Sequence, residues 1–206
     1  YRRLMMGVQT DVQVKFIADE NAADPDRLVT AARPNTSATM ATTTFLGGGA
    51  RNVTVTTTGT GDNEKTCTIT GTDVFGNAMT EVITSTGSAE AVAGAKLFVT
   101  VSAVECSAQY AANITVGSGS LCASPVAGGG RTRLKGYSIV SAGTAGLVDF
   151  YNGTPEDGTI IFKAQTIGTD NSTVDNTIPD EGMLFKSGLA VGYTVATVVL
   201  ANVFFA

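Results

Sequence analysis

The sequence contains no histidine and no tryptophan, and only 15% of its 206 residues are charged. Without imidazole the chain cannot build a Ser-His-Asp or Cys-His nucleophile system, nor a metal site with histidine ligands. Sugar-binding β-sandwiches stack their ligands on flat aromatic side chains, and here the five tyrosines are scattered. The composition therefore weakens both a hydrolase and a carbohydrate-binding interpretation.

Positive charge is also scarce, since 13 Lys and Arg face 18 Asp and Glu, for a net charge of -5. Binding to nucleic acid needs clusters of Lys and Arg that neutralise phosphates. The small groups Arg2-Arg3 and Arg131-Arg133-Lys135 are interpreted as solvated ends of strands or loops. We expect no nucleic-acid partner.

The three cysteines, Cys67, Cys106 and Cys122, are widely spaced and odd in number, which predicts neither a zinc ribbon nor a disulfide framework. Cys67 alternates with threonines and is expected to be a small buried apolar residue. A Cys106–Cys122 bridge stays open, because these two flank an expected strand. A chain whose cysteines form no disulfide framework is suited to folding in a reducing compartment.

No secretory signal is visible after Tyr1. The most apolar run, residues 195–206, is too short to cross a bilayer and is expected to be the last strand. We therefore expect no association with a membrane.

The residues that are abundant, Thr, Val, Gly and Ala, favour strands and turns, and no long segment has the apolar spacing of an amphipathic helix. One short helical run is expected at residues 25–33, with Asp24 as its cap. The predicted class is all-β.

The clearest single element is a β-hairpin over residues 65–84, whose two arms alternate in the period of two that is typical of strands. Between the arms, the side chain of Asp73 can accept bonds from nearby backbone amides, while Gly76 and Asn77 tolerate positive φ. These three residues are predicted to specify a structural turn. The threonine rows on residues 54–58 and 66–70 are expected to face solvent, or to receive a partner strand if they lie on an edge.

Runs of strand pattern separated by turn residues predict two small antiparallel β-sandwich domains, Ig-like or jelly-roll-like, with an extended N-terminal arm. The expected organisation is given by four ranges: 1–50 as the arm and first strand, 51–117 as the first sandwich, 118–130 as a Gly/Ser/Ala/Pro linker, and 131–206 as the second sandwich.

No motif carries chemistry. A glycosidase holds two carboxylates roughly 5–10 Å apart across a cleft, whereas Glu156-Asp157 and Asp180-Glu181 are adjacent pairs beside turn glycines. Asp19 and Glu20 lack the other ligands of a calcium loop. We expect no catalytic residues, no cofactor and no metal, and hence a protein that is not an enzyme.

Several segments together resemble a β-sandwich module of the virion proteins of tailed bacteriophages. The resemblance is carried by residues 51–56 (RNVTVT), 68–83 (TITGTDVFGNAMTEVI), 98–104 and 114–117 in the first domain, and by 133–140, 143–150 and 181–185 in the second. The turn GTDVFGN, followed by TEV, is its most specific part.

The resemblance implies a structural protein of the virion, made in the cytoplasm of the host bacterium. Within that class we expect a decoration or cement protein on the capsid surface, which binds the major capsid protein as a homo-oligomer, with a trimer favoured. The alternative is a tail, fibre or head–tail connector component that contacts the host or a glycan. The apolar residues expected at an interface are Val198, Leu200, Val203, Phe204 and Phe205.

Overall fold

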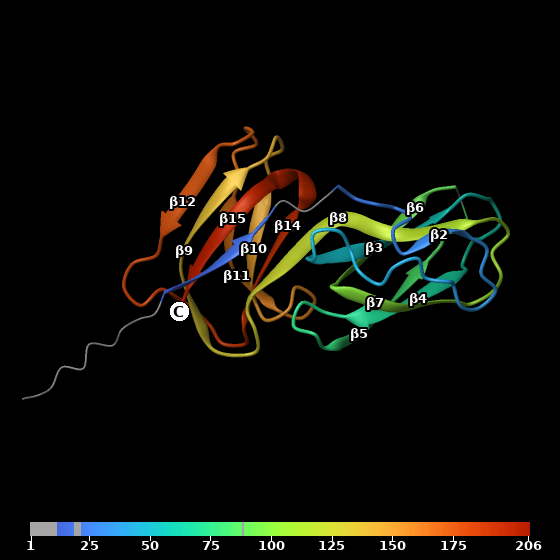
Figure 1. The fold of residues 1–206 in the computed structure, drawn as a ribbon, viewed down its shortest axis with the longest axis horizontal. Helices are drawn as coiled ribbons and strands as arrows, with labels where there is room; N and C mark the ends of the chain where they lie inside the picture. Colours follow the sequence, from blue (N-terminus) through green and yellow to red (C-terminus); the bar gives the residue numbers. More distant parts are fainter. Residues whose placement is uncertain (1–11, 19–21, 88) are drawn as a thin grey trace, which may run out of the picture.

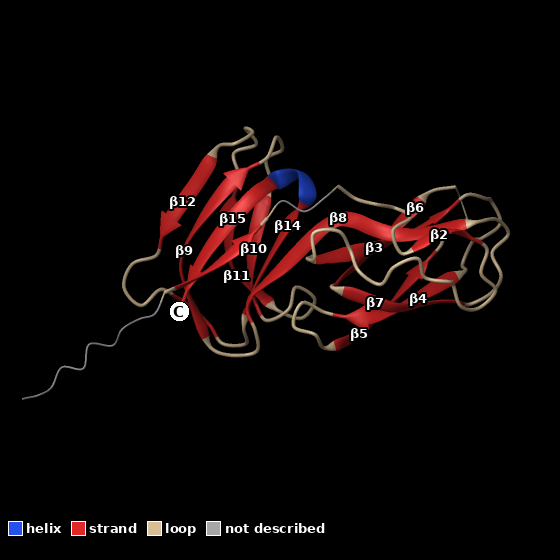
Figure 2. Cartoon of the chain, viewed as in Figure 1, coloured by secondary structure: helices blue, strands red, loops and turns tan. Residues whose placement is uncertain are grey.

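The structure, a computed structural model, describes residues 12–18, 22–87 and 89–206. The described residues form strands and a single 3-10 turn, η1 (Val195–Thr197), as Figure 2 shows. The predicted all-β class is confirmed. Expectations for residues 1–11, which include Arg2 and Arg3, and for Asp19 and Glu20 lie outside the described residues.

Three antiparallel sheets make up the fold (Figure 1). Sheet A has the order β1-β15-β9-β12, with β13 also paired to β9; its strands are β1 (Gln13–Ile17), β9 (Thr132–Ser141), β12 (Thr173–Thr177), β13 (Met183–Phe185) and β15 (Val198–Phe205). Sheet C has the order β5-β4-β7; its strands are β4 (Thr66–Thr72), β5 (Ala78–Thr84) and β7 (Thr100–Cys106).

Sheet B extends through both halves of the molecule, in the order β11-β10-β14-β8-β3-β6, with β2 also paired to β8. Its strands are β2 (Val29–Ala32), β3 (Ala50–Thr57), β6 (Ala91–Phe98), β8 (Ile114–Ala127), β10 (Leu147–Asn152), β11 (Thr159–Gln165) and β14 (Leu189–Thr194). The first part of β8 pairs with β2 and β3, and its last part pairs with β14, so β8 contributes to both sandwiches.

Each sandwich has its own core. The N-terminal unit packs sheet C against β2, β3, β6 and the first half of β8, and its fully buried side chains include Leu28, Ile69, Phe98 and Ile114. The C-terminal unit packs sheet A against β10, β11, β14 and the second half of β8, around Leu134, Phe150 and Phe185. Alternation of buried and half-buried residues along β4 and β9 accounts for these faces.

The expected linker at residues 118–130 is wrong for most of its length, since β8 runs unbroken from Ile114 to Ala127 through both units (Figure 1). Its small residues reflect close packing rather than flexibility. A side chain at Gly117 would collide with the backbone at Asp24 and Pro25, and one at Gly119 would collide with the side chain of Asn52. Glycine inside a strand often marks such a close approach.

The helical run expected at residues 25–33 is also wrong. This segment contains the strand β2 instead, and Leu28 donates its backbone N–H to Val116 O at 2.8 Å. Leu28 and Val29 are both fully buried against the N-terminal core. Tertiary burial of two consecutive apolar residues in extended backbone therefore overrides the local capping pattern.

The first two strands of the chain pair within different units. Its strand β1 pairs with β15 in sheet A of the C-terminal unit, whereas the next strand along the chain, β2, pairs with β8 in the N-terminal unit. Hence β1 and β2, which follow one another in the chain, belong to different sandwiches.

The predicted hairpin is present, with β4 and β5 paired in register from Thr66↔Thr84 to Thr72↔Ala78. Both threonine rows lie on central strands, because β4 lies between β5 and β7 and β3 lies between β8 and β6. These strands therefore have no open edge that could receive a partner strand.

A bulge in β8 marks the joint between the two units. The pairing of β3 with β8 passes from Arg51↔Cys122 directly to Val53↔Ser118, so three residues of β8, 119–121, stand opposite Asn52. The guanidinium of Arg51, which is 1% exposed, donates from Nη2 to Gly119 O at 2.6 Å and from Nε at 3.2 Å. The Asn52 side chain accepts from Leu121 N at 3.0 Å and donates to Gly94 O at 3.1 Å.

We predict that Arg51→Met lowers the free energy of unfolding by about 2–4 kcal/mol, because it leaves a buried carbonyl without its charged donor. Urea denaturation measures the change. The matched control is Arg133→Met, which removes an ion pair to the exposed carboxylate of Glu181 and should cost under about 1 kcal/mol. Equal losses in the two variants would contradict a special role for Arg51.

Candidate functional site

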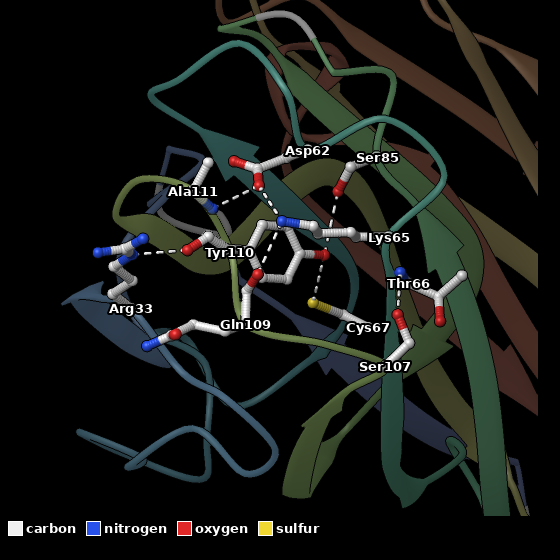
Figure 3. Close-up of polar contacts among 10 residues, drawn as sticks. All are labelled: Arg33, Asp62, Lys65, Thr66, Cys67, Ser85, Ser107, Gln109, Tyr110 and Ala111. Atoms are coloured by element: carbon white, nitrogen blue, oxygen red, sulfur yellow. Dashed lines mark hydrogen bonds and ion pairs between the residues drawn. The ribbon is translucent and has the colours of Figure 1, made fainter.

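The densest group of polar side chains in the described residues lies at the end of the N-terminal unit, around the loop between β7 and β8 (Figure 3). We call this group the Tyr110 cluster; its members are Asp62, Lys65, Cys67, Ser85, Cys106 and Tyr110. The side chains of Asp62, Cys67 and Tyr110 are all 0% exposed. A polar cluster buried this deeply is either structural or reactive, and its geometry distinguishes the two.

Asp62 and Lys65 form the charged part of the cluster. Lys65 Nζ lies 2.8 Å from Asp62 Oδ1, donates to Gln109 O at 2.7 Å, and lies 5.6 Å from the centre of the Tyr110 ring. Asp62 Oδ1 also accepts from Ala111 N at 2.6 Å. Burial raises the pKa of the Asp62 carboxyl, but the hydrogen bonds from Ala111 and Lys65 outweigh it, so the pKa lies below its ordinary value of 3.8.

Tyr110 forms the centre of the cluster. Its hydroxyl lies 3.2 Å from Cys67 Sγ and 3.1 Å from Ser85 Oγ, and its backbone carbonyl accepts from Arg33 Nε at 2.6 Å (Figure 3). Burial is the main cause that raises the pKa of the Tyr110 hydroxyl. The phenol is therefore a neutral hydrogen-bonding group at ordinary pH.

This arrangement ties the loop between β7 and β8 to the ends of β4 and β5. The hydrogen bond from Thr66 N to Ser107 Oγ, at 3.0 Å, adds another tie between the same elements. Because the Tyr110, Cys67 and Asp62 side chains have no exposed surface, a substrate could reach them only if the loop opened. The geometry is that of a structural clamp.

The predicted turn lies where the sequence places it and does more than reverse the chain. Asp73 Oδ1 accepts from Phe75 N at 2.8 Å and from Asn77 N at 2.9 Å, its Oδ2 accepts from Asn77 Nδ2 at 2.9 Å, and Gly76 has φ 85°. The turn presents Val74, which is buried, and Phe75 to a small third core cluster.

This third cluster lies between the two sandwiches. It joins Val74 to Leu97 of β6, Ala123 of β8 and Ala190 of β14. A side chain at Gly188 would contact the Phe75 ring, so the turn tip packs directly on the C-terminal unit. Sequence reasoning missed this contact, although the apolar pair Val74-Phe75 in an otherwise polar turn was a signal for it.

The two acidic pairs lie apart and have different environments. Glu156 Oε1 accepts from Leu97 N of β6 at 2.8 Å and so links the C-terminal unit to the N-terminal one; burial raises the pKa of this carboxyl. Glu181 is exposed and pairs with Arg133 at 2.9 Å, next to Asp180 in a turn.

The predicted interface on β15 is only partly accessible. Val198 and Val203 are 1% and 0% exposed and belong to the C-terminal core, so they are not available as an interface in this fold. Leu200 and Phe205 are half-buried, and Phe205 packs against the same core. Strand alternation explains the difference, because Val203 and Phe204 point to opposite faces of sheet A.

Phe204 instead belongs to an exposed apolar row on the outer face of sheet A, which we call the edge row: Val12, Val14, Phe16 and Phe204, with exposed fractions of 52, 58, 57 and 37%. Phe204 stands opposite Val14 in the pairing of β15 with β1. Within the described residues β1 is an outermost strand of its sheet. Alternation along β1 puts its exposed apolar residues on one face, and only the tertiary structure shows that this face is open.

In the part of the chain that the structure describes, no three His, Cys, Asp or Glu side chains gather as metal ligands. No described helix is long and apolar enough to span a bilayer.

None of the three cysteines forms a disulfide bond in the structure. Cys122 lies in the C-terminal core, while Cys106 lies in the N-terminal core beside Cys67. The fold therefore does not favour the Cys106–Cys122 disulfide that the sequence left open, because these two cysteines lie in different cores.

Comparison with known proteins does not identify the chain. No family model, curated protein or solved structure matches it. Function must therefore be argued from the residues.

We predict that Asp62→Asn destabilises the protein by about 1–3 kcal/mol at pH 7, because it removes a buried charged acceptor. The folded pKa lies below the unfolded value of 3.8, so the carboxylate's contribution is complete above that value and is lost as pH falls through the folded pKa. The difference between wild type and variant in urea denaturation should therefore shrink between pH 5 and pH 2.5. Asp170→Asn, at an exposed position, is the control; a pH-independent difference for Asp62→Asn would refute the assignment.

Proposed function

We propose that this chain is a non-enzymatic structural protein of a tailed-phage virion, which binds the capsid exterior as a decoration or cement protein. Its partner would be the major capsid protein. The resemblance of both units to virion β-sandwich modules supports the class. The edge row supports a binding role, and it is the observation that carries the proposal.

The edge row is unusual for the outermost strand of a soluble sheet. Natural sheets protect their edges with charged side chains, proline or bulges, because an open edge is a template for another strand. Here β1 and the residue before it expose Val12, Val14 and Phe16, and the only charged residue among them is Lys15. Such a surface suits burial against a partner protein.

The energetics favour the row as the centre of an interface. Burial of one large apolar side chain contributes about 1.5–3 kcal/mol, and interfaces are dominated by a few such central residues. A stable protein–protein interface buries about 1,200–2,000 Å² in total, which exceeds what four side chains supply. Polar surface around the row would complete it, as at the rim of most interfaces.

Repetition of the same contact around a capsid suits a homo-oligomer, and a trimer would match local three-fold positions. The net charge of -5 would keep the protein away from packaged DNA. No chemistry is required of the chain, since buried area alone would strengthen the contacts between capsomers. It would be made in the bacterial cytoplasm and reside on the capsid surface.

The deciding experiment mixes the purified protein with capsids, and with virions that lack it, and images the complexes. Binding over the head supports the proposal. Binding only at the tail would replace it with the tail, fibre or connector alternative, and binding to neither would overturn both. Analytical ultracentrifugation at high concentration tests the oligomer separately, where a monomer would contradict it.

Within the edge row, we predict that Phe204→Ser and Val14→Ser each weaken capsid binding at least about tenfold, the equivalent of 1.4 kcal/mol. Their thermal midpoints should stay within about 2 °C of wild type, since exposed side chains contribute little to folding. The matched control is Val82→Ser, which removes a 60% exposed valine from β5 of the other unit. Equal loss of binding in Val82→Ser would argue against the edge row.

A further inference from the structure

Two cysteines of the Tyr110 cluster face each other across neighbouring strands. Cys67 of β4 and Cys106 of β7 are directly opposite partners in the antiparallel ladder, and their Sγ atoms lie 3.4 Å apart. Opposite residues in such a ladder have Cα atoms about 4.5–5.5 Å apart, inside the range of roughly 4.4–6.8 Å that a disulfide spans. Closing the gap between the sulfurs needs side-chain movement only.

We propose that Cys67 and Cys106 form a reversible thiol–disulfide site that reacts with small-molecule disulfides. The site is distinct from the proposed capsid-binding surface and does not depend on it. The ladder is regular at this point, because its one register shift lies farther along, between Thr70 and Gly71. The bond would therefore form without rearrangement of the strands.

The surroundings of the two sulfurs differ in a way that fits their roles. Cys106 is 8% exposed and ends β7, while Cys67 is 0% exposed and lies 3.2 Å from the Tyr110 hydroxyl. The hydrogen bond with Cys106 is the main cause that lowers the pKa of the Cys67 thiol, and the Tyr110 contact acts in the same direction. Cys106 is the more exposed of the two buried sulfurs, and the hydrogen bond with Cys67, followed by burial, raises the pKa of its thiol.

The exchange balances in two steps. Cys106, the more exposed sulfur, loses its thiol proton and attacks one sulfur of the small disulfide, whose S–S bond breaks to give a mixed disulfide and one small thiolate. The Cys67 thiolate then attacks the Cys106 sulfur and expels the second small thiolate. The protein loses two electrons to the small disulfide, and the two released thiolates take up the two thiol protons.

The Cys67–Cys106 disulfide would link β4 covalently to β7, next to the clamp that holds the loop between β7 and β8. The two cysteines are 39 residues apart, so the bond closes a long loop in the unfolded chain. For a protein of this size the oxidised form should unfold about 5–10 °C higher than the reduced form. A reductant such as dithiothreitol should reverse the shift.

The test equilibrates the protein in a glutathione redox buffer, starting both from the native state and from denaturant, so that access to the buried sulfurs does not decide the result. Because no Lys or Arg lies between Cys106 and Cys122, trypsin is combined with chymotrypsin, which cuts after Tyr110. We expect a linked Cys67–Cys106 pair, a mass lower by two hydrogen atoms and the higher midpoint. Cys122→Ala should behave like wild type, whereas Cys106→Ala should lose the link.

Three free thiols after refolding in the oxidising buffer would overturn the proposal, as would a link that includes Cys122. A persistent mixed disulfide with glutathione would overturn it too, because Cys67 would then have failed to attack. If Cys106→Ala does not fold, the peptide map of the wild-type protein still decides.

Discussion

The bulge in β8 is the constraint on which the rest of the molecule depends. Strand β8 belongs to both sandwiches, and its register against β3 shifts where three of its residues, 119–121, stand opposite the single residue Asn52. A bulge leaves backbone groups without ladder partners, and buried groups of that kind are costly. Arg51 and Asn52 form hydrogen bonds with the backbone of Gly119 and Leu121 on the neighbouring strand, which explains why an arginine is buried here.

Other contacts across the joint reinforce this one. The turn of the β4–β5 hairpin places Val74 in the small cluster between the units, and the Glu156 carboxylate accepts from Leu97 on β6. These contacts come from segments far apart in the sequence. Together with a shared strand, they make two sandwiches into one continuous body and leave the outer face of sheet A as the surface with an exposed apolar row.

At the opposite end of the N-terminal unit, buried polar contacts hold a loop in place. Tyr110, Asp62 and Lys65 hold a loop against two strands with hydrogen bonds that are buried and therefore sensitive to loss of a partner. Beside this clamp, the antiparallel ladder of β4 and β7 places Cys67 opposite Cys106. These two form the one pair of neighbouring sulfurs among the described residues.

The sequence alone determined the all-β class, the β4–β5 hairpin and its Asp73 turn, because alternation and turn chemistry act over a few residues. Tertiary structure decided what those rules could not reach: that residues 118–127 are strand, that β1 crosses to the other unit, and that Val203 is buried while Phe204 is exposed. It also decided that Cys106 lies opposite Cys67. In each case the outcome depends on pairing between distant segments, and small or polar residues carry no local pattern that specifies their partners.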